Sequence, residues 1–134
     1  MLITRASEYA ILSLILLSSA KEPMDSETLS SELVISKSFL AKILQSLAKQ
    51  NILKSYKGVK GGFVLNQEPS QIHMLDIMTC VEGKGPAVFE CSPSQEDCPS
   101  DRANICSLWP FLNKLQGKID LFLAEITLED VLKD

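Results

Sequence analysis

Residues 26–66 hold two helical patterns, a tight turn and a basic hairpin in one continuous order, and few folds accommodate that order. Capping residues and apolar spacing predict a short helix over 26–33, a turn at 34–35 and a longer helix over 36–50. The apolar side chains of the longer helix recur every three or four residues, at Phe39, Leu40, Ile43, Leu44 and Leu47. Such spacing buries one face of a helix and leaves the other face in solvent.

A glycine-rich hairpin is predicted directly after this helix pair. Short strands are expected over 52–56 and 63–66, and the loop between them reads Lys57-Gly58-Val59-Lys60-Gly61-Gly62. Glycine supplies the positive-φ turns that such a hairpin needs and lets the backbone approach a phosphate closely. The arrangement is typical of a winged helix-turn-helix, in which the second helix enters the major groove of DNA and the wing reaches the backbone or the minor groove.

The distribution of charge supports a DNA-binding function for this segment. The whole chain is acidic, with a formal net charge of −4, which taken alone argues against a nucleic-acid-binding protein. Between residues 33 and 67, however, there are six lysines and no acidic residue, which indicates a local anion-binding face, although a merely solvated lysine face is the alternative. The predicted DNA contacts are Ser36, Lys37, Ser38, Lys42, Lys57, Lys60, Gly61 and Gly62.

The rest of the chain is predicted to be mainly helical. Amphipathic helices are expected over 4–19 and from about 70 to 82, and residues 84–104 read as irregular because prolines and acidic residues interrupt any periodic pattern. A long helix begins near Leu108, and a fresh cap at Thr127 predicts a short C-terminal turn.

The long helix carries a narrow apolar seam with a heptad-like repeat, formed by Leu108, Leu112, Leu115, Ile119, Phe122 and Ile126. A single amphipathic helix that packs on its own domain shows the same stripe. We favour a dimer interface, because the seam is narrow and the helix is terminal.

Three cysteines cluster in the irregular stretch, with the spacing C-x6-C-x7-C, at Cys91, Cys98 and Cys106. Thiolates are the usual ligands of iron–sulfur clusters, and a flexible loop can wrap such a group. Structural zinc sites usually use closer cysteine pairs, so zinc fits less well, and a disulfide switch or inert thiols stay open. Cys80 is interpreted as a small buried residue of a helix, and His73 as a surface or capping residue.

The sequence favours neither an enzyme nor a membrane protein. It contains no visible nucleophile–base pair, and its only histidine lies outside the cysteine cluster. The apolar run at 9–17 is too short to span a bilayer, and Glu8 precedes it where export signals avoid acidic residues. We therefore expect a cytoplasmic chain with reduced thiols.

Several stretches together resemble the Rrf-type winged-helix repressors of bacteria, a family that includes IscR, NsrR, RirA and CymR. "LITRASEYAILSLILLS" resembles the opening helix, and "LAKILQSLAKQNILKSYKGVKGGFVL" resembles the recognition helix and its Gly-Gly-aromatic wing. "IHMLDIMTCVEG" is similar to the linker helix and "ITLEDVL" to the usual ending. The wing motif and the C-terminal motif are fairly specific for this family when they occur together in one chain.

The resemblance implies a homodimer that binds double-stranded operator DNA. In the cluster-carrying members three loop cysteines hold an iron–sulfur cluster, and the matching residues are Cys91, Cys98 and Cys106; the cluster type, 2Fe-2S or 4Fe-4S, stays open. NsrR-like members add an acidic ligand from the first helix of the other subunit, which corresponds to Glu8. Two departures are the longer cysteine spacing and Trp109, which stands where IscR-like members have a histidine.

The predicted fold class is thus mainly α with a small β-hairpin wing, an α+β winged helix-turn-helix followed by a long dimerisation helix. We expect a DNA-binding domain at 1–70, a linker helix at 71–83, a cluster-binding loop at 84–107 and the dimerisation helix with its C-terminal turn at 108–134.

The predicted function is a transcriptional regulator, most simply a repressor, that senses redox state, nitric oxide or iron–sulfur status. The alternatives are a metal-free repressor that responds to a small ligand, thiol oxidation or a partner protein, as CymR-like relatives without the three cysteines do, and an interaction module that uses the seam without DNA.

Overall fold

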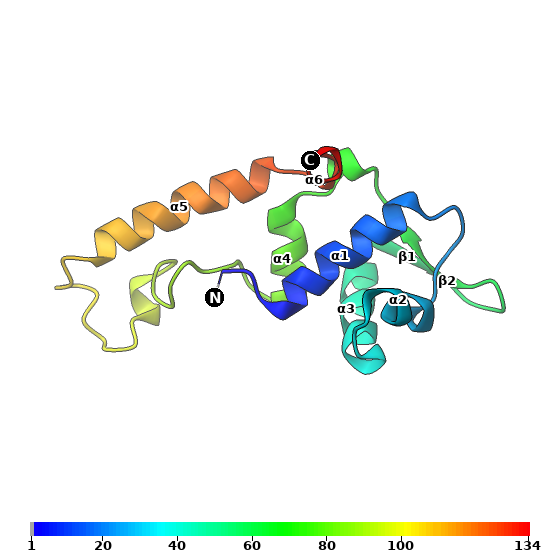
Figure 1. The fold of residues 1–134 in the computed structure, drawn as a ribbon. Helices are drawn as coiled ribbons and strands as arrows, with labels where there is room; N and C mark the ends of the chain where they lie inside the picture. Colours follow the sequence, from blue (N-terminus) through cyan, green and yellow to red (C-terminus); the bar gives the residue numbers. More distant parts are fainter. Residues whose placement is uncertain (1) are drawn as a thin grey trace.

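The computed structural model describes residues 2–134, which form a helical body with a hairpin at one end and an arm at the other (Figure 1). The helices and strands are α1 (Arg5–Ser19), α2 (Ser26–Leu33), α3 (Lys37–Lys49), β1 (Leu53–Tyr56), β2 (Gly62–Leu65), α4 (Met74–Glu82), α5 (Trp109–Glu125) and α6 (Leu128–Lys133). Single 3-10 turns precede α4 and lie in the irregular stretch, at Pro69–Gln71 and Gln95–Asp97. The predicted mainly α fold with a β-hairpin wing is confirmed.

Side-chain caps start the first two helices, which the sequence predicts over 4–19 and 26–33. The Thr4 hydroxyl accepts the backbone N–H of Ser7 at 3.1 Å, and the Asp25 carboxylate accepts that of Thr28 at 2.7 Å. These bonds satisfy N–H groups that the first turn of a helix leaves free. The turn between α2 and α3 is made by Val34 in the left-handed conformation, with φ 56°.

The wing pairs β1 with β2 in antiparallel register, from Leu53 opposite Leu65 to Tyr56 opposite Gly62. The strands match the predicted ones to within one residue at their ends. A further antiparallel bridge joins Phe63 to Met24, with the Phe63 N–H donating to the Met24 carbonyl at 2.8 Å. The hairpin is therefore attached to the segment before α2.

The hydrophobic core lies where α1, α3, α4 and the hairpin meet. Its fully buried members include Leu14, Leu29, Leu40, Leu44, Leu47, Ile77 and Leu128. Leu128 belongs to α6, and its N–H donates to the Ile72 carbonyl at 2.8 Å, while Met74 N–H donates to the carbonyl of Ile126 at 2.9 Å. The C-terminal turn, which the sequence grouped with the long helix, thus packs into the winged-helix core.

The arm consists of the loop 84–107, which runs outward from the body, and α5, which returns towards the body beside it (Figure 1). Pro110 lies in the first turn of α5, where a proline is tolerated, as the sequence predicts. Among the described residues of α5, Gln116 is the one that is buried, so the apolar side chains of this helix are at most half-buried within one chain. In the described residues 2–134 no helix is long and apolar enough to cross a membrane.

Candidate DNA-binding surface and cysteine loop

The N-terminal turn of α3 presents the residues that the sequence predicts to contact DNA. Ser36, Lys37, Ser38 and Lys42 are all exposed, because the opposite face of the helix is buried in the core. The Ser36 and Ser38 hydroxyls lie 3.1 Å apart, and Lys37 Nζ lies 3.7 Å from a Glu27 carboxylate oxygen. Both contacts are at the surface, where such groups readily exchange partners for phosphate oxygens.

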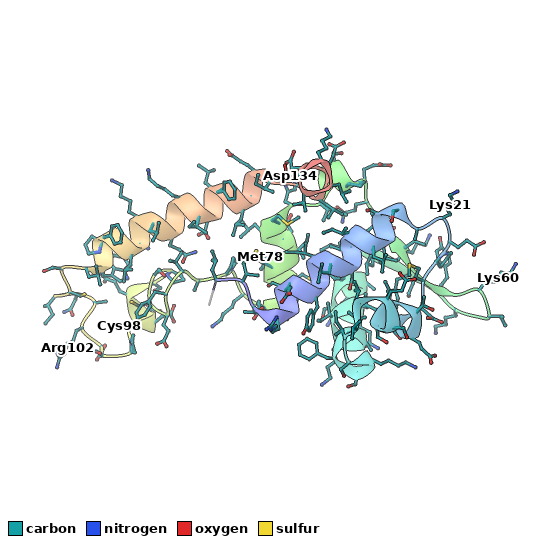
Figure 2. All side chains as sticks on the ribbon, in the orientation of Figure 1. Lys21, Lys60, Met78, Cys98, Arg102 and Asp134 are labelled. Carbon is teal, nitrogen blue, oxygen red and sulfur yellow. The ribbon has the colours of Figure 1, made fainter. Side chains whose placement is uncertain are left out.

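The tip of the wing carries the other predicted lysines. Lys57, Val59 and Lys60 are exposed, and Figure 2 shows Lys60 at the far end of the hairpin, on the opposite side of the molecule from Cys98. Sequence reasoning missed a further exposed pair on β1, in which Lys54 Nζ lies 5.2 Å from the centre of the Tyr56 ring. This pair could have been predicted from the alternation of side chains along a strand, which places residues 54 and 56 on the same face.

The two adjacent glycines of the wing have a packing role. A Cβ on Gly61 would lie 2.3 Å from the Tyr56 carbonyl oxygen, and one on Gly62 would lie 2.5 Å from the backbone of Met24. Gly62 also has φ 142°, a conformation that side chains disfavour. A larger residue in place of Gly62 would move the hairpin away from Met24, and one in place of Gly61 would distort the wing loop itself. A direct contact of these glycines with DNA stays a prediction.

Cys98 lies in a tight turn of the loop, where its sulfur accepts the backbone N–H of Arg102 at 3.3 Å. This and neighbouring backbone N–H groups, those of Ser100 and Asp101 among them, lower the pKa of the Cys98 thiol below its ordinary value. Hydrogen bonds to the charged form favour that form, so the turn is prepared to hold a thiolate. A thiolate is the form that binds metal and reacts with oxidants.

The other predicted ligands are placed differently. Cys91 is buried, Cys106 is half-buried, and both are free thiols, as is Cys98. Glu8 lies on the first turn of α1, where Arg5 Nη1 donates to its carboxylate at 2.9 Å. Across residues 2–134 no three histidine, cysteine or acidic side chains gather as a metal site within the single chain. The assignment of Cys91, Cys98, Cys106 and Glu8 as ligands stays a prediction.

The structure also gives the surroundings of Cys80 and His73, two residues outside the loop for which the sequence predicts a role. Cys80 is half-buried against the core, its thiol donates to the Ser46 carbonyl at 3.2 Å, and burial raises its pKa. These surroundings agree with the interpretation of Cys80 as a small buried residue of a helix. His73 occupies the N-cap position of α4 without a side-chain capping bond, and its Nδ1 is buried and unbonded.

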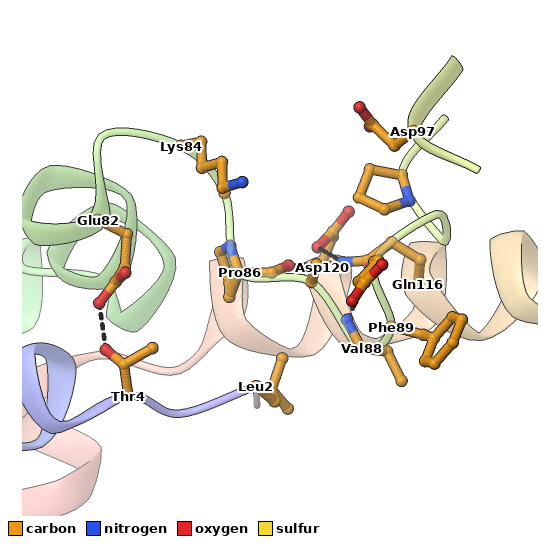
Figure 3. A pocket seen from close by; sticks show the side chains of 14 residues that line it. Leu2, Thr4, Glu82, Lys84, Pro86, Val88, Phe89, Asp97, Gln116 and Asp120 are labelled. Atoms are coloured by element: carbon orange, nitrogen blue, oxygen red, sulfur yellow. Dashed lines mark hydrogen bonds between the residues drawn. The ribbon is translucent and has the colours of Figure 1, made fainter. Parts of the chain in front are cut away.

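A hollow of about 750 Å³ lies between the DNA-binding body and the arm (Figure 3). Its wall on the body side contains Thr4, whose hydroxyl donates to the Glu82 carboxylate. Its wall on the arm side contains Gln116 and Asp120 of α5, with the loop residues from 84 onward between the two walls. The hollow therefore marks the joint at which body, loop and α5 meet.

The predicted seam of α5 is partly open and partly covered. Leu108 and Phe122 are 56% and 59% exposed, whereas Leu112, Leu115 and Ile119 are half-buried. Ile126 lies just beyond the helix and packs against the core of its own chain. Leu108 and Phe122, near the two ends of the seam, thus leave apolar surface available.

Comparison of the sequence with known proteins gives a consistent result. The profile of the Rrf2 family, described as an iron-dependent transcriptional regulator, matches residues 3–134. The HTH-type transcriptional regulator IscR of Xenorhabdus nematophila is 26% identical over 136 residues, which cover 100% of this chain and 80% of that protein. YffB of Lactococcus lactis, whose name places it among HTH-type transcriptional regulators, is 30% identical over 111 residues, covering 81% of this chain and 70% of YffB.

Solved structures share the fold. CymR, the global cysteine regulator of B. subtilis, superimposes with a TM-score of 0.73 at 24% identity and covers 99% of this chain and 97% of its own. T. potens IscR superimposes with a TM-score of 0.76 at 23% identity, covering 100% of this chain and 88% of its own. The relatives are regulators rather than enzymes, and the profile spans almost the whole sequence. This chain therefore belongs to the Rrf2 family of DNA-binding transcriptional regulators.

Proposed function

We propose that the protein is a homodimeric regulator that binds operator DNA through α3 and the wing, and that an iron–sulfur cluster held by Cys91, Cys98 and Cys106 controls this binding. The observation that carries the proposal is the presence of three free thiols in one irregular loop, in which the Cys98 sulfur already accepts a hydrogen bond from a backbone N–H. The loop is fastened to α5, whose exposed apolar side chains suit a second copy of the chain.

The donor set fits a cluster in its chemistry. Three soft sulfur donors match iron–sulfur ligation, and the N–H groups around Cys98 stabilise negative charge on its sulfur. When bound, a cluster supplies a redox-active centre whose charge and stability depend on its oxidation state. Cys91 and Cys106 flank this turn on the same loop, so closing a site requires the loop, and not the core, to move. Glu8 of a second subunit is the proposed fourth ligand.

DNA recognition divides between two elements. The exposed polar residues at the start of α3 are suited to base edges in the major groove, as in other helix-turn-helix proteins. Lys57 and Lys60 at the wing tip are suited to phosphates, which position the protein and carry no sequence information. Homodimerisation through α5 presents two such surfaces to the two halves of an operator.

The cluster is tested by anaerobic purification followed by absorption spectroscopy and iron and sulfide analysis. We expect wild type to be brown and to contain both elements, and the Cys91→Ala/Cys98→Ala/Cys106→Ala variant to be colourless. Cys80→Ala, which removes the thiol outside the loop, is the matched control and stays brown. A wild type that is colourless even after reconstitution with iron and sulfide contradicts the cluster.

A metal-free thiol sensor is the second candidate, because the lowered pKa of Cys98 also favours reaction with oxidants. In that case the colourless wild type still binds DNA, and a mild peroxide treatment changes its affinity in a way that Cys98→Ala abolishes. An affinity that is insensitive to peroxide excludes this candidate.

The DNA interface is tested by fluorescence anisotropy with a random-sequence duplex at several salt concentrations. Lys60→Ala is expected to weaken binding to every sequence and to lower the slope of log affinity against log salt by about one. Lys118→Ala, on α5, is the control and leaves the slope unchanged. An unchanged slope in Lys60→Ala removes the wing tip from the interface.

A further inference from the structure

The helix α5 carries two stripes with different chemistry. The apolar seam is one, and a second stripe at the same spacing consists of Trp109, Asn113, Gln116 and Asp120. Each member of the second stripe follows a seam residue by one position, so the two stripes lie about 100° apart around the helix. A rotation of α5 therefore moves both stripes together.

Gln116 is the centre of the second stripe. It is only 4% exposed, its Oε1 accepts the backbone N–H of Val88 at 2.9 Å, and its Nε2 donates to the Pro86 carbonyl at 2.8 Å (Figure 3). The same Nε2 donates to a carboxylate oxygen of Asp120 at 2.7 Å, which orients the amide. One side chain thus satisfies a donor and an acceptor of the loop backbone.

Two more side chains of the stripe bond the loop, one and two turns earlier on α5. Asn113 Nδ2 donates to the Ser92 carbonyl at 2.8 Å, and Trp109 Nε1 donates to the Cys91 carbonyl at 2.8 Å. We call Trp109, Asn113, Gln116 and Asp120 the polar clasp. The clasp holds the backbone of residues 86–92, including Cys91, the first predicted ligand.

The clasp supplies the side-chain hydrogen bonds between α5 and this part of the loop, in which Pro86, Cys91 and Ser92 are buried. A buried amide that loses its hydrogen-bond partners is strongly destabilising, whereas the loss of a hydrogen bond between surface groups costs little. Residues 86–92 therefore have one strongly preferred position on α5. Cys98 and Cys106 lie beyond the held segment, in the part of the loop that is free of the clasp's bonds.

We propose that the polar clasp transmits the state of the cysteine loop to the dimer seam, with Gln116 as the positioning residue. This inference rests on the proposed function. A group that binds Cys91 together with Cys98 and Cys106 pulls on a backbone that Trp109 holds. Either α5 turns with the loop, which shifts the seam, or the clasp opens; in both cases the two sites are coupled through one physical element.

The first test uses the apo protein and needs no cluster. In Gln116→Leu we expect the amide of Val88 to exchange faster with deuterium, and Cys91 to react with iodoacetamide about tenfold faster, the equivalent of one net hydrogen bond. The rate at Cys98 stays unchanged, because that residue lies outside the clasp. Gln95→Leu, an exposed glutamine of the same loop, is the matched control and alters neither rate. An unchanged Cys91 rate in Gln116→Leu overturns the proposal.

The second test measures coupling. In wild type, reconstitution with iron and sulfide is expected to change the dimer dissociation constant, measured by sedimentation, by about fivefold or more. In Gln116→Leu the iron content per chain stays the same and the change falls towards none. If the variant keeps the wild-type change while its Cys91 reacts faster, the clasp positions the loop but transmits nothing, and the proposal is wrong.

A conservative pair of variants separates the clasp from general damage to the fold. Gln116→Glu places a carboxylate beside Asp120 and opposite the Pro86 carbonyl, to which it cannot donate, so it is expected to open the clasp. Asp120→Asn leaves both bonds of Gln116 to the loop backbone in place and keeps an oxygen that can accept from Nε2, so it should keep the slow alkylation of Cys91 and the coupling. Slow alkylation in Gln116→Glu, or loss of either property in Asp120→Asn, contradicts the role of Gln116. If wild type takes up no iron, the proposed cluster fails, and exchange and alkylation still decide whether the clasp positions Cys91.

Discussion

The winged-helix body and the arm made of α5 and the loop 84–107 are held together by different forces. In the body, leucines and isoleucines from α1, α3, α4 and α6 are fully buried in one core. In the arm, side chains of α5 bond the loop backbone, while large apolar residues such as Phe111 and Phe122 are exposed. The body is complete as one chain, and the arm leaves a surface for another.

This difference has a functional consequence. A core of close-packed apolar side chains has one arrangement, which keeps α3 and the wing in a fixed relation for binding DNA. A loop held by a few polar bonds can exchange one arrangement for another at small cost, as a sensing element must. The predictions below test this division, from the largest expected effect to the smallest.

The sharpest test of the body is Leu44→Ala in the recognition helix. Leu44 is fully buried, so we expect the free energy of unfolding in urea to fall by about 3 kcal/mol. Phe122→Ala in the arm is the counterpart and should change the stability of the monomer far less. Similar losses for both variants would show that the arm has a core of its own and would break the comparison.

The arm is tested by placing a charge in its seam. Phe122 is 59% exposed in the single chain, so Phe122→Asp leaves the fold intact and is expected to raise the dimer dissociation constant about a hundredfold. Sedimentation at several concentrations measures this change. Lys114→Ala, on another face of α5, is the control. An unaltered dimer in Phe122→Asp, or a wild type that is a monomer at every concentration, rejects the seam as the interface.

A smaller effect is expected at the turn of the helix-turn-helix. Val34 has φ 56° and is 90% exposed, so its side chain adds strain and little packing. Val34→Gly is predicted to raise the free energy of unfolding by about 1 kcal/mol, as measured by urea denaturation. Val59→Gly, at the exposed wing tip without a positive φ, is the control and should give no gain. A loss of stability in Val34→Gly would show that the turn is not strained.

The smallest effect concerns the pH dependence of stability. Backbone N–H bonds from Thr28 and Thr127 lower the pKa values of Asp25 and Asp130 below the ordinary 3.8. A lowered folded-state pKa stabilises the native state above pH 3.8, and that stabilisation is lost as the pH falls through the folded pKa. Asp25→Asn keeps an acceptor that does not titrate, so its unfolding midpoint should fall less steeply below this pH. Glu90→Gln in the arm serves as the comparison, and an equal effect there would contradict the assignment to the caps.

Much of the body could be predicted from sequence because each of its signals is local. Caps at Thr4 and Asp25, apolar periodicity in α3 and the glycine loop of the wing each act within a few residues of their position. The bridge between Met24 and Phe63 could not be predicted, since it joins segments whose contact depends on how the hairpin folds back. The same holds for Leu128, which the seam pattern did not assign to the core of the body.

The candidate site shows the same limit more strongly. The three cysteines and the lysines are evident as residue types at a spacing, whereas Gln116 resembles any polar residue on an amphipathic helix. Its role appears only when residues 86–92 lie against α5 and their backbone groups need partners.

The sequence by itself determined the order of helices and strands, the basic face and the family, because local propensity, periodicity and charge are written along the chain. Tertiary structure decided which surfaces are buried, where α6 packs and how the cysteine loop is attached to α5. Those features depend on contacts between segments that are far apart in the sequence. Neither residue of such a contact has a partner until folding brings the two segments together, so no local pattern reveals it.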